Sequence, residues 1–190
     1  MNQNFLADPK VSQLLEDVDL DLAQQCQAAG CQRCRAKLHR DDYPRKPRGG
    51  PSHWDKRHSF TCAEHRHRTT PASVRYLGAK VYVGAVVVLL SALHHGISQR
   101  RLCFLRQHIS VDRRTLAHWR KWWLERFVPS AFWKSARANF MPLLCELTLP
   151  LGLCERFGVE HVERLVDLLK FLAPITTTSH HTIKHFDGGG

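Results

Sequence analysis

The spacing of hydrophobic residues divides the chain into helical stretches on either side of a segment that has few aliphatic side chains. Between residues 9 and 29 the apolar positions recur at helical intervals, at Val11, Leu14, Leu15, Val18 and Leu22. Asp8 and Pro9 are typical of a helix start, and Gly30 is typical of a helix end. The pattern therefore predicts one helix over residues 9–29.

Helical spacing returns over residues 73–127, with breaks near Gly96 and Ser110. It predicts a mostly apolar helix at 80–95, a second at 99–108 and a third at 113–127, with Ser98 and Asp112 as N-caps of the last two. One stripe of the third helix is apolar and expected to be buried: Leu116, Trp119, Trp123 and Phe127. Because its other faces carry basic residues, the arrangement is typical of a helix-turn-helix.

A further helical region is predicted at residues 139–173, with interruptions at Pro150 and Gly158. Its last part has an apolar side, formed by Val159, Val162, Leu165, Val166, Leu169 and Leu172. Glu160, Glu163 and Asp167 are expected to form its solvated face. We expect this helix to pack on the body of the protein or on a second copy.

Residues 31–72 differ in composition from the rest and are rich in Cys, His, Arg, Pro and Gly. Residues 45–51 (RKPRGGP) have the composition of a loop. A segment with so few aliphatic side chains cannot build an apolar core, so another interaction has to stabilise it.

Charge is distributed unevenly along the 190 residues. The chain has 28 Lys and Arg against 17 Asp and Glu, a formal net charge of +11. Residues 31–137 carry a net charge of +17, whereas residues 1–30 carry −4 and residues 138–190 carry −2. A basic middle between mildly acidic ends favours a centre that binds a polyanion such as nucleic acid. The alternative is a basic surface that only keeps the protein in solution.

Composition excludes several classes of protein. Hydrophobic residues make up 43% of the chain, with 11 Gly and 9 Pro, so it is neither collagen-like nor wholly disordered. The most apolar run, at 81–93, is too short to span a bilayer, and the N-terminus lacks the pattern of a secretory signal. The basic residues do not line one face of a single amphipathic helix, which disfavours a membrane surface. We expect a cytoplasmic protein.

Seven cysteines in a cytosolic chain favour metal binding or free thiols over disulfides. Two pairs of residues have the short spacing of zinc knuckles, Cys31-x2-Cys34 and Cys62-x2-His65. Together they complete a tetrahedral Zn²⁺ site, and the metal would supply the folding free energy that the missing core cannot. Residues 57–62 alternate like a strand entering the second knuckle and residues 65–71 leave it, so this segment is predicted to be a zinc ribbon.

The fourth zinc ligand is open between His65, His67, His39 and Cys26. The other cysteines, Cys103, Cys145 and Cys154, fall within apolar helical patterns and are expected to be core residues. If Cys31 and Cys34 are unrelated thiols, no such site forms.

The predicted fold class is mainly α, a helix-turn-helix bundle with an inserted small zinc-ribbon β element. The expected parts are an N-terminal helix (1–30), a zinc ribbon (31–72), a helix-turn-helix DNA-binding domain (73–137), a helical packing or oligomerisation segment (138–175) and a disordered tail (176–190).

The helix at 113–127 offers candidate contacts to DNA. Its first turns lie where a recognition helix meets base edges, and they carry Arg113, Arg114, Ala117 and His118. The residues better placed for phosphates are Arg100, Arg101, Arg120 and Lys121. Trp119 and Trp123 are expected to be core residues. The alternative is a three-helix core element with a solvated basic face.

The order of Cys-x2-Cys, SFTC-x2-H-x2-R-x2-P and RRTLAHWRKWW resembles the front end of bacterial insertion-sequence transposases and of their stand-alone relatives. The resemblance covers roughly residues 31–127. It implies a zinc ribbon with Zn²⁺ at Cys31, Cys34, Cys62 and His65, followed by a helix-turn-helix that reads element DNA. His65 departs from the pattern, because such ribbons usually have Cys there. The resemblance implies a bacterial, nucleoid-associated protein that binds double-stranded DNA, as a homodimer or with a separate transposase or recombinase subunit.

The carboxylate triad of an RNase-H-like transposase is not evident after residue 127, so we expect no catalysis by this chain alone. An HNH-like metal-dependent nuclease is one alternative, with His39 as general base and Asp41 or His67 as metal ligand. A transcription regulator unrelated to transposition and an RNA-binding zinc protein are two others.

Overall fold

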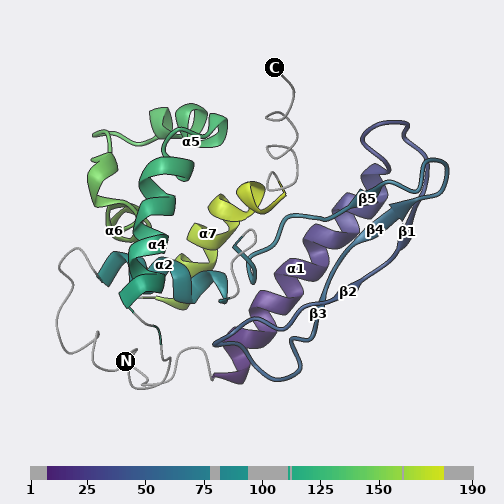
Figure 1. Ribbon diagram of the computed structural model, residues 1–190, viewed down its shortest axis with the longest axis horizontal. Coiled ribbons are helices and arrows are strands. Elements are labelled where there is room, and N and C mark those ends of the chain that lie inside the picture. Colours follow the sequence, from purple (N-terminus) through teal and green to yellow (C-terminus); the bar gives the residue numbers. More distant parts are fainter. Residues whose placement is uncertain (1–7, 78–81, 94–110, 112, 160, 178–190) are drawn as a thin grey trace, which may run out of the picture. The chain divides into compact units, whose positions relative to one another are not determined.

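The computed structural model describes residues 8–77, 82–93, 111, 113–159 and 161–177 (Figure 1). The described chain is mainly helical with a small β component, as the sequence predicts. It divides into two compact units. We call the described residues up to 83 together with 169–177 the ribbon unit, and the described residues within 84–168 the helical unit.

The ribbon unit begins with α1 (Pro9–Ala29), whose two ends lie where the sequence predicts them. The Asp8 carboxylate caps the start by accepting a hydrogen bond from the Lys10 N–H at 2.9 Å. Gly30 ends the helix with a φ of 72°, a conformation that costs glycine little. The helix buries Val11, Ser12, Leu15, Val18, Asp19 and Ala23.

Five short strands follow α1 and form two antiparallel sheets. The three-stranded sheet has the order β1 (Leu38–Arg40), β4 (Phe60–Cys62), β5 (Arg68–Thr69), and it pairs Leu38 with Cys62 and Phe60 with Thr69. The second sheet pairs β2 (Tyr43–Pro44) with β3 (Lys56–Arg57). The predicted strand at 57–62 is thus divided between two sheets. The division falls at Ser59, whose N–H donates to the Asp42 carboxylate at 3.2 Å.

Two buried clusters in the described part of the ribbon unit bear on the predicted sites. An apolar one joins α1 to the three-stranded sheet and consists of Ala23, Cys31, Leu38, Phe60 and Cys62. The other is polar and centres on Asp19, which is fully buried and pairs with Arg75 at 2.7 Å. The Asp19 carboxylate also accepts hydrogen bonds from the Ser73 hydroxyl at 2.6 Å and from the Val74 N–H at 2.7 Å.

Arginines also surround Tyr76 in the ribbon unit. The guanidinium carbons of Arg45, Arg57 and Arg75 lie 4.9, 5.2 and 5.4 Å from its ring centre. Arg57 is buried and donates to the carbonyl oxygen of Pro71. Burial lowers the pKa of Arg57 and raises that of Tyr76. The interior of this unit is therefore held partly by polar contacts, as its shortage of aliphatic residues requires.

In the helical unit, α2 (Gly84–Leu93) packs against α4 (Arg113–Trp122) and α6 (Leu151–Phe157). A π-helical turn, Trp123–Phe127, extends α4, and α5 (Ala131–Ala136) follows. The predicted stripe of α4 and this turn is buried: Leu116, Trp119, Trp123 and Phe127. Trp133 packs on Phe127 with 5.2 Å between ring centres, and its Nε1 donates to the Glu146 carboxylate at 2.9 Å.

The region predicted as helical at 139–173 is only partly so. α7 (Val162–Leu172) follows α6, and the chain passes between them through Gly158 in the left-handed conformation. Short 3-10 turns lie at Arg137–Asn139, Glu146–Thr148 and Ala173–Thr176. Residues 139–150 contain no α-helix, so the prediction is wrong there, because Pro142 and Pro150 interrupt the backbone hydrogen bonds of a helix. Cys145 is exposed, which corrects its assignment to the core, whereas Cys154 is buried as predicted.

Part of the predicted helix-turn-helix lies outside the described residues. The undescribed part includes the helix predicted at 99–108, residues 80–81 and 94–95 of the helix predicted at 80–95, and Ser98, Arg100, Arg101, Cys103 and Asp112. Tyr82 and Val83 form isolated β-bridges, so α2 begins at Gly84 and the predicted helix start is wrong. The predicted tail is described only to residue 177. None of the described helices has the length and apolar character that a membrane span requires.

Candidate metal centre and basic helix

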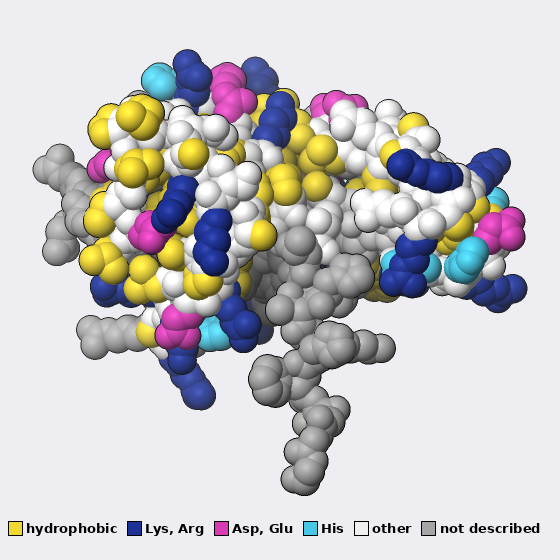
Figure 2. Space-filling view, turned by 90° about the horizontal axis from the view of Figure 1, so that it is seen from above, with side chains coloured by type: hydrophobic (Ala, Val, Ile, Leu, Met, Phe, Trp, Pro, Cys, Tyr) yellow, Lys and Arg dark blue, Asp and Glu magenta, His cyan; other side chains and the backbone are white. Residues whose placement is uncertain are grey.

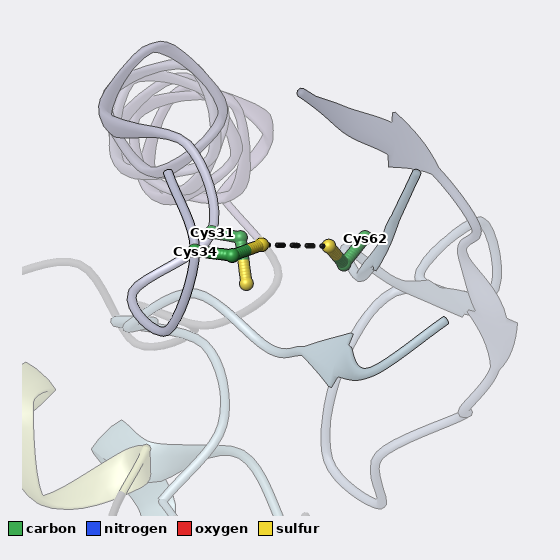
Figure 3. Close-up of side chains that lie close together, drawn as sticks. All are labelled: Cys31, Cys34 and Cys62. Carbon is green, nitrogen blue, oxygen red and sulfur yellow. Dashed lines mark hydrogen bonds between the residues drawn. The ribbon is translucent and has the colours of Figure 1, made fainter. Parts of the chain in front are cut away.

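Three of the predicted zinc ligands lie together in the ribbon unit (Figure 3). Cys31 and Cys34 come from the turn after α1, and Cys62 comes from the end of β4. Their Sγ atoms all lie within 4.8 Å of one another, and those of Cys34 and Cys62 are 3.5 Å apart. Sulfurs around a tetrahedral Zn²⁺ are about 3.8 Å apart, given a Zn–S bond of about 2.3 Å. The donor set and its spacing therefore fit a thiolate-binding metal.

The turn that carries Cys31 and Cys34 is closed by two backbone hydrogen bonds. The Cys31 N–H donates to the carbonyl oxygen of Ala36 at 2.9 Å, and the Arg35 N–H donates to that of Cys31 at 2.7 Å. Arg35 has a φ of 61°. This geometry turns the chain sharply, so both cysteines of the x2 pair face the same side.

The turn after β4 repeats this pattern at the same relative positions. The Cys62 N–H donates to the carbonyl oxygen of His67 at 3.0 Å, and the Arg66 N–H donates to that of Cys62 at 3.0 Å. Arg66 has a φ of 49°. His65 thus occupies in the second turn the backbone position that Cys34 occupies in the first. We call these two turns, residues 31–36 and 62–67, the first and second knuckle.

The side chains considered for the fourth ligand do not join the three sulfurs. In the described part of the chain, the group of ligand atoms within 4.8 Å of one another contains only Cys31, Cys34 and Cys62. His65 and His39 are exposed, and His67 and Cys26 are half-buried. Three of the four predicted positions are thereby brought together, and the choice of the fourth remains a prediction.

Hydrogen bonds in the first knuckle alter the acidity of its thiols. Backbone N–H groups of Arg33 and Cys34 lower the pKa of Cys31 to about 7, because they stabilise its thiolate. A hydrogen bond from the Ala36 N–H favours a lower pKa for Cys34. The Cys62 thiol, burial and the Cys31 thiol outweigh this hydrogen bond, so the pKa of Cys34 is raised. Closely spaced thiols cannot all ionise cheaply without a cation, and a divalent metal supplies the missing positive charge.

The second predicted site, the basic face of α4, lies in the helical unit. Arg114, Ala117, His118, Arg120 and Lys121 are exposed, whereas Leu116 and Trp119 of the same helix are buried. A shallow open hollow is lined by Arg114, Thr115, Ala117, His118 and Lys121. Lys121 lies 3.6 Å from the Glu125 carboxylate. Arg113 is the first residue of α4, and its side chain is not among those that the structure describes.

The residues considered for a nuclease site are arranged differently. The Asp41 carboxylate accepts hydrogen bonds from the Thr61 hydroxyl at 2.6 Å and from Arg68 at 2.7 Å. His39 lies on β1, paired with Thr61 across the sheet. Among the described residues, His39, Asp41 and His67 do not gather into a metal-ligand group.

Comparisons of the chain with protein-family models, with curated proteins and with solved structures find no match.

Proposed function

We propose that this chain is a zinc-stabilised, sequence-specific double-stranded DNA-binding protein of a mobile genetic element, without a catalytic domain of its own. The observation that supports the proposal most directly is the division of α4 into a buried stripe and an exposed basic face. A recognition helix needs both, because one face has to be held by the fold while the other meets the major groove.

We assign the contacts with DNA bases to the first turns of α4. Arg114 and His118 are one turn apart and exposed, with the small side chain of Ala117 beside them. Arg can donate two hydrogen bonds to guanine, and a small apolar residue allows the helix to approach the bases. Arg120 and Lys121, in the last turn, suit phosphate contacts. The proposed DNA contacts also include Arg113, Arg100 and Arg101.

Zinc would be held by the thiolates of Cys31, Cys34 and Cys62 and by the imidazole of His65. The matched backbone of the two knuckles supports His65, because it stands where the first knuckle has its second ligand. Four protein ligands leave no open position, so the metal would stabilise the fold and perform no chemistry. The mobile-element setting rests on the resemblance of residues 31–127. A transcription regulator with the same DNA-binding parts is the alternative.

Metal content and DNA binding, measured on one purified sample, test this proposal. We expect one zinc per chain by elemental analysis, and binding to duplex DNA that a chelator abolishes and added zinc restores. Absence of stoichiometric metal would contradict the zinc site, and absence of duplex binding would contradict the function. Metal-dependent cutting of the DNA would instead favour the nuclease alternative.

Arg114→Ala is expected to weaken binding to the preferred DNA site about 5- to 150-fold, the effect of losing one bidentate contact to a base. Binding to random DNA should weaken less, because only the base contact is specific. Titration of both DNAs with wild type and variant measures the difference. Arg164→Ala, which removes an exposed arginine from α7, is the control. An equal loss on both DNAs would make Arg114 a phosphate contact.

A further inference from the structure

Each knuckle places an arginine in a backbone conformation that favours glycine. Arg35 and Arg66 have φ values of 61° and 49°, and no other non-glycine residue in the described part of the chain has a positive φ. A side chain with a Cβ is strained in this conformation, whereas glycine adopts it freely. An arginine in this strained backbone conformation thus occurs at the equivalent position of each of the two turns.

The fold itself does not compensate this strain through the arginine side chains. Both residues are exposed, and neither side chain forms a hydrogen bond or ion pair where the structure describes the chain. Strained residues of this kind are often retained for function. The two guanidinium groups are therefore available to a partner outside the chain.

The knuckles carry an excess of positive charge. Arg33 and Lys37 are also exposed and make no ion pair within the described residues, and Glu64 is the one carboxylate of the two turns. The neighbouring carboxylates, Asp41 and Asp42, are already paired with Arg68 at 2.7 Å and with Arg40 at 2.9 Å. Figure 2 shows several Lys, Arg and His side chains, together with an acidic side chain, at the right-hand end of the molecule.

The two turns lie side by side. The Ala63 N–H of the second knuckle donates to the carbonyl oxygen of Lys37, just after the first, at 3.0 Å. The Cys34 and Cys62 sulfurs are 3.5 Å apart, so the proposed metal would fix the two turns together. Arg33, Arg35, Lys37 and Arg66 thus lie on two adjoining turns that contain one carboxylate, Glu64.

We infer that Arg33, Arg35, Lys37 and Arg66, the knuckle surface, bind the phosphate backbone of duplex DNA. This inference rests on the proposed function and adds a second contact to the same DNA-binding activity. Arginine suits phosphate because its planar donors match two phosphate oxygens, and exposed cations release counterions when they meet DNA. Such contacts carry no sequence information, so the knuckle surface would position the protein while α4 reads bases.

Glycine substitution of the two strained arginines tests the inference in the full, zinc-loaded chain. In the double variant Arg35→Gly, Arg66→Gly, the side chains are lost while the backbone conformation becomes easier to adopt. We expect unchanged zinc content and intact folding. We expect weaker binding to preferred and random duplexes by the same factor. The slope of log affinity against log salt should fall by about 1.8, for two phosphate contacts.

A charge-matched double variant on α7, Arg164→Ala with Lys170→Ala, controls for net charge, because both residues are exposed. It should retain the wild-type salt slope. If wild type binds duplex DNA and the glycine variant binds equally well with the same slope, the inference is wrong and the proposed function stands. A loss confined to the preferred site, or a preference of wild type for RNA, also overturns it. If wild type binds no duplex, the proposed function and the inference fail together.

Discussion

Replacing Cys62 with serine is expected to abolish zinc binding and to unfold the knuckle end of the ribbon unit. Cys62 supplies one of the three clustered thiols, and a serine hydroxyl is a poor substitute for a thiolate ligand. Structural zinc contributes about 10–16 kcal/mol in small zinc-dependent peptides. That is comparable with the entire stability of a typical domain, about 5–15 kcal/mol.

Little else can hold this end of the unit once the metal is lost. Its apolar cluster contains Ala23, Leu38 and Phe60, and its other buried members are the ligands Cys31 and Cys62 themselves. Zinc content by elemental analysis and thermal unfolding by circular dichroism measure the effect. Cys145→Ser is the matched control, because Cys145 is an exposed thiol in the helical unit and should be neutral. Retention of one zinc per chain by Cys62→Ser would contradict the ligand set.

Local signals explain what the sequence allowed us to predict. The bounds of α1 follow from Asp8, Pro9 and Gly30, which act within one turn of the helix ends. The proximity of Cys31 and Cys34 follows from their x2 spacing, because a single tight turn brings the two side chains together. The buried stripe at Leu116, Trp119, Trp123 and Phe127 follows from the helical spacing of these residues, although the turn Trp123–Phe127 is π-helical.

The identity of the fourth ligand cannot be predicted from such local signals. The backbone position of His65 follows from the second knuckle, but the direction of its side chain depends on rotation about its own bonds. The positive φ at Arg35 and Arg66 could not be predicted from the sequence either, because glycine is the usual signal of that conformation and is absent at both positions.

Long-range polar pairing was missed altogether. Asp19 lies in α1 among Glu16, Asp17 and Asp21, so its sequence context resembles a solvated helix face. Its partners, Ser73, Val74 and Arg75, lie more than fifty residues further along the chain. The usable signal was its place in the helix, since Asp19 follows Val18 and stands four residues from Leu15 and from Ala23, all of them buried.

Asp19→Asn is expected to destabilise the ribbon unit by about 3–5 kcal/mol, the usual cost of removing one partner from a buried ion pair. The carboxylate is fully buried, and Arg75, also buried, donates to it at 2.7 Å. An amide of the same shape cannot neutralise the guanidinium, and it can accept from fewer of the three donors. Unfolding of the zinc-loaded chain in urea measures the loss.

The control for this prediction is Asp21→Asn, two residues further along α1. Asp21 is exposed and has no partner among the described residues, so its replacement should change stability by no more than about 0.5 kcal/mol. Equal urea midpoints for Asp19→Asn and wild type would show that the buried pair does not stabilise the unit. Because Asp19 is not part of the cluster at the knuckles, the folded variant should still bind one zinc. That outcome separates this buried network from the metal centre, whose loss in Cys62→Ser removes zinc and stability together.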